Sequence, residues 1–268
     1  KTWSVSDWQS YVTSLQDFQS LGGIVVFALS NDDSKTNADI SAGLPELFPS
    51  LNLDDAWITA ANVDINGSSS KTYTLMSAPC GITAEYCLAG DGYGITMPGG
   101  AIIGSGTTGY SVSAGTSFVA PQVSGAVAIL SQHFPNHNNT QIVDRLLASA
   151  KNNIGFAYVG SVTFGNGVVH EYSSEAGHGI LDIYAALQPI INSSYISRVN
   201  AVSANGGSVS FAFKETSILS ARSFGDAISE ALNGEFTYMY DALDGGFAFD
   251  LDQAVQPSLM VSKPSISA

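Results

Sequence analysis

Charged residues are scarce in this sequence. They make up 12% of its 268 residues, about half of the roughly 25% that is usual in soluble proteins. Lys and Arg together number 9 against 23 Asp and Glu, so the formal net charge is −14. Nucleic-acid phosphates are bound by clustered basic side chains. The sequence lacks such clusters, so we expect no nucleic acid among its partners.

Long apolar runs are also missing. The apolar stretches at 24–29 and 181–191 are shorter than the ~18 residues that a membrane-spanning helix requires, and the second contains Asp182 and Pro189. We therefore expect no membrane span within this chain. The sequence begins at Lys1 without a charged and apolar leader, which leads us to expect a processed chain or a piece of a longer one.

Cysteine is limited to Cys80 and Cys87. The neighbouring Pro79, Gly81 and Gly90 indicate a surface loop, and the low charge content fits a chain outside the cytosol, where disulfides persist. We expect the two residues to form a disulfide, which would stabilise the fold by roughly 2 to 3 kcal/mol in the chain-entropy account. Two buried free thiols are the alternative.

Helical and strand-like patterns alternate along the first 190 residues, which is typical of an α/β layered fold. A continuous apolar run at 24–29 predicts a strand buried in a parallel sheet, and 56–63 predicts a second one. Helices are predicted at 7–20 after a Ser6 cap, 38–47, 118–133, 140–150 after a Thr140 cap, and 181–187. Beyond Pro189 the pattern becomes β-rich, with a hairpin-like stretch at 238–251, so we expect a boundary near residue 190.

The segment from Gly115 to Gly125 places Ser117 directly before an apolar helix. Free backbone N–H groups and the dipole at a helix N-terminus favour developing negative charge, which suits a nucleophile. Gly-Thr-Ser alone is usually a turn or a cap. The whole segment, Gly-Thr-Ser-Phe-Val-Ala-Pro-Gln-Val-Ser-Gly, resembles the nucleophile motif of the subtilase family, Gly-Thr-Ser-x-x-Ala-Pro-x-Val-x-Gly. The resemblance implies that Ser117 is a catalytic nucleophile, although Gln122 stands where the family usually has His.

A second resemblance concerns the strand that ends at Asn31. The residues Gly-Ile-Val-Val-Phe-Ala-Leu-Ser-Asn at 23–31 are similar to the subtilase strand that ends in the oxyanion-hole asparagine. This implies that Asn31 and the backbone N–H of Ser117 would bind the oxyanion. It also implies that Ala28, Leu29 and Ser30 would line the pocket for the substrate side chain before the scissile bond. Ser30 stands where the family prefers Gly.

Three further segments resemble one particular group within the subtilase family. Residues 56–64, 80–90 and 177–182 follow one another in the order seen in autotransporter subtilases, which are bacterial proteins exported through the outer membrane. The segments 223–232 and 240–251 are similar, more loosely, to the part that links their protease domain to the barrel. The resemblance therefore implies a secreted or cell-surface location. It also implies that 1–190 is the C-terminal part of a peptidase domain and 191–268 a β-rich extension.

The acid and the base of the triad are absent from this sequence. In subtilases the order Asp, His, Ser places both upstream of the nucleophile, but all four histidines follow Ser117, and none matches the family's base. A serine without its base is a poor nucleophile, so we expect this chain alone to be nearly inactive. An N-terminal fragment of the same precursor that stays bound, a truncation, and a degenerate relative without its catalytic half are the three explanations.

The sequence thus predicts a partial three-layer subtilisin-like α/β fold with a mostly parallel sheet. It predicts a serine endopeptidase that acts on protein or peptide substrates, with an inactive scaffold or adhesion module on the bacterial surface as the alternative. No cofactor is expected. The carboxylates that might hold structural calcium lack a recognisable loop spacing, and a solvated acidic face explains them more simply. They are Asp32, Asp33, Asp39, Asp54 and Asp55.

Overall fold

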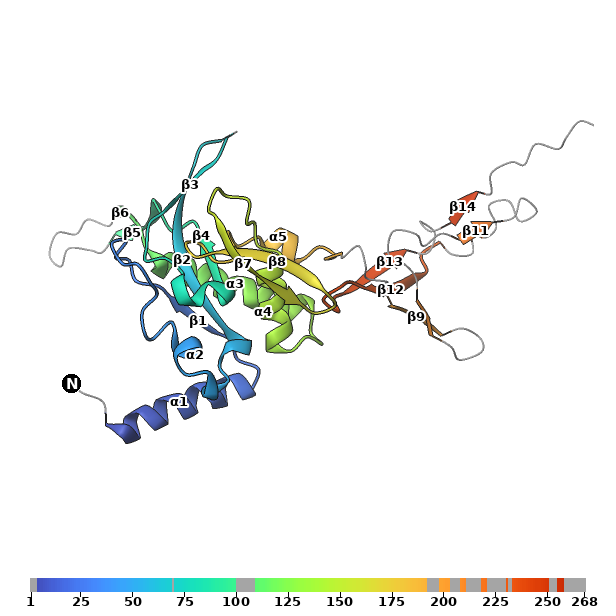
Figure 1. The fold of residues 1–268 in the computed structure, drawn as a ribbon. Helices are drawn as coiled ribbons and strands as arrows, with labels where there is room; N and C mark the ends of the chain where they lie inside the picture. The colour runs from blue at the N-terminus through green and yellow to red at the C-terminus, as the bar shows by residue number, and fades with distance from the viewer. Residues whose placement is uncertain are drawn as a thin grey trace, which may run out of the picture. The chain divides into compact units, whose positions relative to one another are not determined.

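The computed structural model divides the chain into two compact units, residues 1–190 and 191–268. It describes residues 4–68, 70–99, 109–191, 198–202, 208–210, 218–220, 230, 233–250 and 255–257. Figure 1 shows the elements of both units along the chain. The candidate functional residues all lie in the first unit, so its architecture is described first.

A short parallel sheet forms the centre of the first unit (Figure 1). Strand β2 (Trp57–Asn66) lies between β1 (Val25–Ala28) and β4 (Cys87–Gly90), and both pairings are parallel. From Val63 onward β2 pairs instead with β3 (Thr72–Leu75) in the antiparallel sense. The expected α/β fold with a mostly parallel sheet is therefore confirmed.

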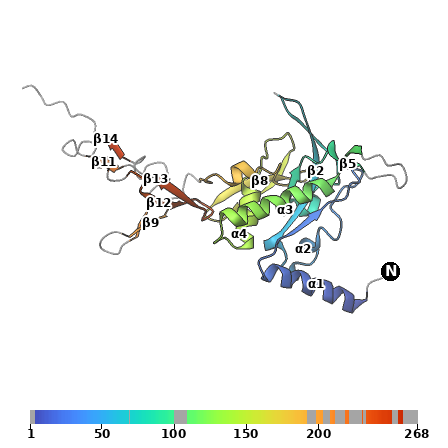
Figure 2. The same ribbon diagram turned by 180° about the vertical axis from the view of Figure 1, so that it is seen from behind.

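The two faces of the sheet are covered by different elements. Alternate residues of a strand point to opposite faces, and Ala61, Val63 and Ala89 belong to a core cluster that includes both cysteines. The other face is covered by α3 (Thr116–His133), which contacts β1, β2 and β4 (Figure 2). Its fully buried side chains are Val119, Val123, Ala126 and Leu130.

Two helix caps lie elsewhere than predicted. Helix α1 (Val5–Ser20) is capped by Ser4 and not by Ser6, because Asp7 can reach back to the backbone N–H of Ser4 and complete a capping box. Helix α4 (Asn139–Ala148) is capped by Asn138 and not by Thr140. In this case the side chain of Gln141 closes the box by accepting from the N–H of Asn138.

Two predicted helices are shorter than expected. The segment 38–47 is helical only in α2 (Leu44–Leu47), and the helix predicted at 181–187 is α5 (Ile183–Ala186). Pro45 stands in the first turn of α2, so this helix begins directly before it. Single 3₁₀ turns follow at η1 (Pro49–Leu51) and η2 (Asp54–Ala56).

Cys80 and Cys87 form a disulfide with their Cα atoms 6.0 Å apart. The expected surface position was wrong, because both residues are completely buried. They bracket the 3₁₀ segment η3 (Gly81–Tyr86), and residues from far along the chain cover them. A Cβ atom on Gly177 would stand only 2.2 Å from the carbonyl oxygen of Cys87, so only glycine permits this close approach.

Hairpins complete the first unit, and short strands make up the described part of the second. The hairpins are β5 (Ile95–Gly99) with β6 (Gly109–Ser113), and β7 (Tyr158–Phe164) with β8 (Val168–Ser173). The second unit pairs β9 (Arg198–Val202) with β10 (Ser208–Ser210), β11 (Ile218–Ser220) with β14 (Val255–Pro257), and β12 (Phe236–Tyr240) with β13 (Gly246–Asp250). The last pair confirms the predicted hairpin. Its turn is held by Asp241, whose Oδ1 accepts from the N–H groups of Leu243 and Gly245.

Candidate active site

Ser117 is the second residue of α3, and its side chain is exposed. The residue before the helix, Gly115, has φ +153° and offers no side chain as a cap. Other parts of the chain therefore satisfy the first backbone groups: the N–H of Gly115 donates to the carbonyl of Gly92. Among the described residues the N–H of Ser117 itself has no acceptor, so it is available to an external group.

The side chain of Asn31 caps the helix from the neighbouring strand end. Its Oδ1 accepts from the backbone N–H of Thr116 at 2.8 Å and lies 3.1 Å from the Thr116 hydroxyl. Because the backbone N–H of Thr116 can only donate, the oxygen of the carboxamide must face it, and Nδ2 is the end that points elsewhere. Within the described part of the chain Nδ2 has no acceptor. Asn31 Nδ2 and the Ser117 N–H are thus two donors without a described acceptor, and the Asn31 side chain is joined to the residue directly before Ser117.

The three residues predicted to line a substrate pocket differ in where their side chains lie. The side chain of Leu29 is buried in the core, and its carbonyl accepts from the Thr116 hydroxyl at 2.7 Å. Ala28 and Ser30 are partly exposed, and the carbonyl of Ser30 accepts from the N–H of Ala78. Any contact with a bound peptide would therefore involve Ala28, Ser30 or the backbone, since the Leu29 side chain faces inward.

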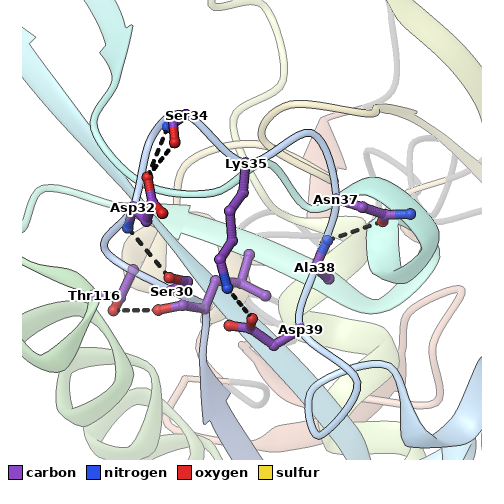
Figure 3. A network of polar contacts seen from close by, with 9 residues as sticks. Ser30, Asp32, Ser34, Lys35, Asn37, Ala38, Asp39 and Thr116 are labelled. Carbon is purple, nitrogen blue, oxygen red and sulfur yellow. Dashed lines mark hydrogen bonds and ion pairs between the residues drawn. The ribbon is translucent and has the colours of Figure 1, made fainter.

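A polar loop follows Asn31 and is ordered by its own side chains (Figure 3). Asp32 Oδ1 accepts from the N–H and the hydroxyl of Ser34, and these hydrogen bonds lower the pKa of Asp32. Lys35 pairs with Asp39, which raises the pKa of Lys35. At the far end, Asn37 Oδ1 accepts from the N–H groups of Ala38 and Ile82 and ties the loop to η3.

The amide side chains of Gln122 and Asn62, neither of which was predicted as a site residue, also bind backbone groups near the start of α3. Gln122 Nε2 donates to the carbonyl of Asp91 at 3.0 Å, which ties α3 to the end of β4. Asn62 Oδ1 accepts from the N–H of Gly92 at 2.9 Å. Asn62 lies in the segment 56–64 that supports the family resemblance, but nothing in that segment marked it as a functional residue. The only available signal was its place near the end of a predicted strand, where parallel sheets present functional side chains.

The histidines contact other groups. His170 and His178 face each other through their Nδ1 atoms at 2.9 Å, and their Nε2 atoms face the carbonyls of Ala150 and Glu85. His133 lies in the last turn of α3, and its ring and that of His137 contact Phe134. These contacts give none of the four a described interaction with Ser117.

The described ranges contain no group of three or more His, Cys, Asp or Glu side chains that could hold a metal ion. Of the carboxylates considered for calcium, Asp32 and Asp39 are engaged by Ser34 and Lys35. Likewise, no helix in the described ranges is long and apolar enough to cross a membrane.

Fold and site together define an α/β protein whose parallel sheet supports a helix with an exposed serine in its first turn. Residues 2–179 match the profile of the subtilase family, peptidase S8. The chain belongs to this family.

Individual relatives are distant. The chain is 28% identical over 165 residues to an extracellular serine protease of Serratia marcescens, covering 56% of this chain and 15% of that protein. It is 28% identical over 166 residues to a subtilisin of Bacillus pumilus, covering 62% and 47%. It thus spans less than half the length of both relatives. Among solved structures, fervidolysin of Fervidobacterium pennivorans, a keratinolytic enzyme related to subtilisin, aligns with a TM-score of 0.48 at 22% identity, covering 73% of this chain and 26% of that one.

Proposed function

We propose that this chain is the C-terminal part of the catalytic domain of a serine endopeptidase that cleaves protein or peptide substrates, with Ser117 as the nucleophile. One observation carries the proposal. The exposed Ser117 lies in the first turn of α3, and the Asn31 side chain, whose Nδ2 has no acceptor among the described residues, is hydrogen-bonded to the adjacent Thr116. Free donors at a helix N-terminus suit a tetrahedral oxyanion.

The reaction would follow from these groups. Ser117 Oγ attacks the carbonyl carbon of the scissile peptide, and its proton passes to a histidine base. The negative charge that develops on the carbonyl oxygen is stabilised by Asn31 Nδ2 and the Ser117 N–H. The peptide C–N bond then breaks as the histidine returns the proton to the leaving amine, and water hydrolyses the acyl-enzyme. We assign the histidine and its aspartate partner to a segment N-terminal to residue 1.

The same reasoning extends to organisation and location. We assign 1–190 to the C-terminal part of the peptidase domain and 191–268 to an extension that follows it. A secreted or bacterial cell-surface protein fits this assignment, since one matched relative is an extracellular protease. The order of the segments 56–64, 80–90 and 177–182 supports an autotransporter-like precursor.

The second candidate function is an inactive scaffold or adhesion module with a subtilase fold. It is favoured by one observation: His170 and His178 bind each other and backbone carbonyls, and neither has a described interaction with Ser117. In that case Ser117 would serve only to begin the helix.

A fluorophosphonate probe separates the two functions, because it labels only an activated serine. The full-length protein, including any segment before residue 1, is incubated with the probe, and the labelled peptide is identified by mass spectrometry. Labelling at Ser117 that is lost in Ser117→Ala supports the peptidase. An intact protein that stays unlabelled, and that cleaves no protein substrate, supports the scaffold. Intact-mass analysis under denaturing conditions shows whether a second polypeptide accompanies the chain.

A further inference from the structure

We propose that Asn62 is a positioning residue for Ser117: its side chain holds the segment from which α3 starts and so sets the direction of the nucleophile. This inference rests on the proposed function, because it concerns the same serine. Asn62 is completely buried, and it is joined to the start of α3 through Gly92.

The side chain of Asn62 is needed at the point where β2 stops pairing with β4 and begins to pair with β3. The parallel pairing of β2 with β4 ends at Asn62, which is opposite Gly90, and from Val63 onward β2 pairs with β3. Gly92 is therefore buried just beyond the end of the parallel ladder, where no strand can accept from its N–H. A buried N–H without an acceptor costs about 1 to 3 kcal/mol. Asn62 Oδ1 supplies the acceptor at 2.9 Å.

Gly92 in turn holds Gly115, the residue directly before α3. Its carbonyl accepts from the N–H of Gly115 at 2.9 Å. The contact is tight, because a Cβ atom on Gly92 would lie 2.6 Å from the Gly115 carbonyl oxygen and 2.8 Å from both Asn62 Oδ1 and the Val119 side chain. Gly92 is therefore closely packed against Gly115 and Asn62, and we infer that a change in its position would be passed on to Gly115.

Two asparagines, one after β1 and one in β2, thus hold the consecutive residues Gly115 and Thr116. Asn31 follows β1 and binds Thr116 directly, whereas Asn62 ends the parallel part of β2 and holds Gly115 through Gly92. These are the two residues directly before Ser117. Asn31 also carries the free Nδ2 donor, while Asn62 has no contact with a substrate position. Its effect would be exerted only through the backbone of Gly115.

The other end of the Asn62 carboxamide carries an energetic cost. Nδ2 is buried and has no hydrogen-bond partner among the described residues. Turning the amide over would not help, because two donors would then face each other at Gly92. The side chain therefore leaves one donor unsatisfied in order to hold Gly92, at the end of the sheet where Ser117 stands.

The test compares three variants of the full-length protein. Asn62→Leu keeps the shape of the side chain but removes the acceptor, and Asn62→Asp keeps an acceptor oxygen. Thr59→Val is the matched control, because Thr59 is equally buried three positions earlier on β2, and its hydroxyl is hydrogen-bonded to that of Thr83 in η3 and not to the start of α3. For each we would measure the rate constant of fluorophosphonate labelling at Ser117, the fraction labelled at completion, and kcat and KM for a peptide substrate.

A positioning role predicts a specific pattern. Asn62→Leu should label to completion but about 10 to 100 times more slowly, since a displacement near 1 Å can cost about a hundredfold. Its kcat should fall with KM nearly unchanged, because nucleophile alignment matters only in the transition state. Thr59→Val should lower the melting temperature without slowing labelling. Asn62→Asp should recover most of the rate.

Other results would overturn the inference. If Asn62→Leu labels at the wild-type rate, or slows only as much as Thr59→Val, Asn62 is merely structural. If Asn62→Leu does not fold, Asn62→Ala provides the same comparison at a lower steric cost. An unlabelled wild-type protein would instead refute the proposed function, so the two failures are distinguishable.

Discussion

The side chain of Asn31 and the backbone of Thr116, 85 positions apart in the sequence, are joined by a hydrogen bond of 2.8 Å. The bond uses the oxygen of the carboxamide and leaves the nitrogen free. One side chain thus combines two tasks: Oδ1 caps α3, and Nδ2 is available to an oxyanion. These tasks can be separated by substitution.

Asn31→Asp should keep the cap on α3 and remove the donor to the oxyanion. The carboxylate still accepts from the Thr116 N–H and is favourably placed at a helix N-terminus, but it has no donor. We expect the rate of fluorophosphonate labelling to fall about 100 to 1000 times, the range known for removing one oxyanion donor from subtilisin, a relative of this chain. The free energy of unfolding, measured by denaturant titration, should stay close to that of the wild type.

Asn31→Ala is the matched comparison, because it removes both tasks. It should label as slowly as Asn31→Asp and should also lose about 1 kcal/mol of stability with the cap. An Asn31→Asp protein that labels at the wild-type rate would show that Nδ2 does not bind the oxyanion.

The sequence predicted those parts of this site that are encoded by a contiguous run of residues. The segment from Gly115 to Gly125 and the apolar strand before Asn31 are local, so their elements could be predicted. Asn62 could not be predicted, because its partner is a backbone N–H 30 positions away. That N–H lacks an acceptor only because β2 leaves β4 at this point. The N–H of Gly92 thus lacks an acceptor because of how β2, β3 and β4 pair with one another.

The remaining errors have similarly specific causes. Several neighbouring polar residues could cap α1 and α4, and the choice was decided by which residue in the first turn could reach back, Asp7 or Gln141. The cysteines were expected at the surface because of the glycines around them. They are buried because residues 176–178, about ninety positions later, pack over them, which no local pattern indicates.

Removing the disulfide should destabilise the first unit without changing the candidate site. Cys80 and Cys87 are seven positions apart, and closing so short a loop is worth roughly 2 to 3 kcal/mol in the chain-entropy account. For a unit of this size that corresponds to about 5 to 10 °C in melting temperature. The double variant Cys80→Ala/Cys87→Ala should show this decrease in calorimetry, and a reducing agent should not lower its melting temperature further. A double variant as stable as the wild type would contradict the prediction.

The pair formed by the buried His178 and the partly exposed His170 should make the fold sensitive to acid. Both Nε2 atoms lie 3.0 Å from carbonyl oxygens and must carry hydrogen there, and a hydrogen bond between the two Nδ1 atoms needs one more proton. A second extra proton would place two cations 2.9 Å apart. The pKa of His178 is therefore lowered to about 4 from 6.5, first because of burial and second because of the charge on His170. Burial also lowers the pKa of His170.

The sign of the pH dependence follows from this lowered pKa. Between pH 6.5 and about 4 the unfolded chain binds a proton at His178 that the folded chain does not, so the free energy of unfolding decreases as the pH falls through this window. The loss should approach about 2 to 3 kcal/mol. The groups that face the ring are the Glu85 carbonyl, His170, Phe164 and Tyr172, whose hydroxyl donates to the Glu85 carboxylate.

Denaturant titrations at pH 7.5, 6, 5 and 4 test this dependence. In His178→Gln the slope between pH 6.5 and 4 should be clearly smaller than in the wild type, even if the variant is less stable at every pH. His133→Gln, at the exposed end of α3, is the control for replacing a histidine outside this pair. If His178→Gln retains the full slope, the acid sensitivity arises from other groups, because a side chain that cannot titrate contributes nothing to the difference in bound protons.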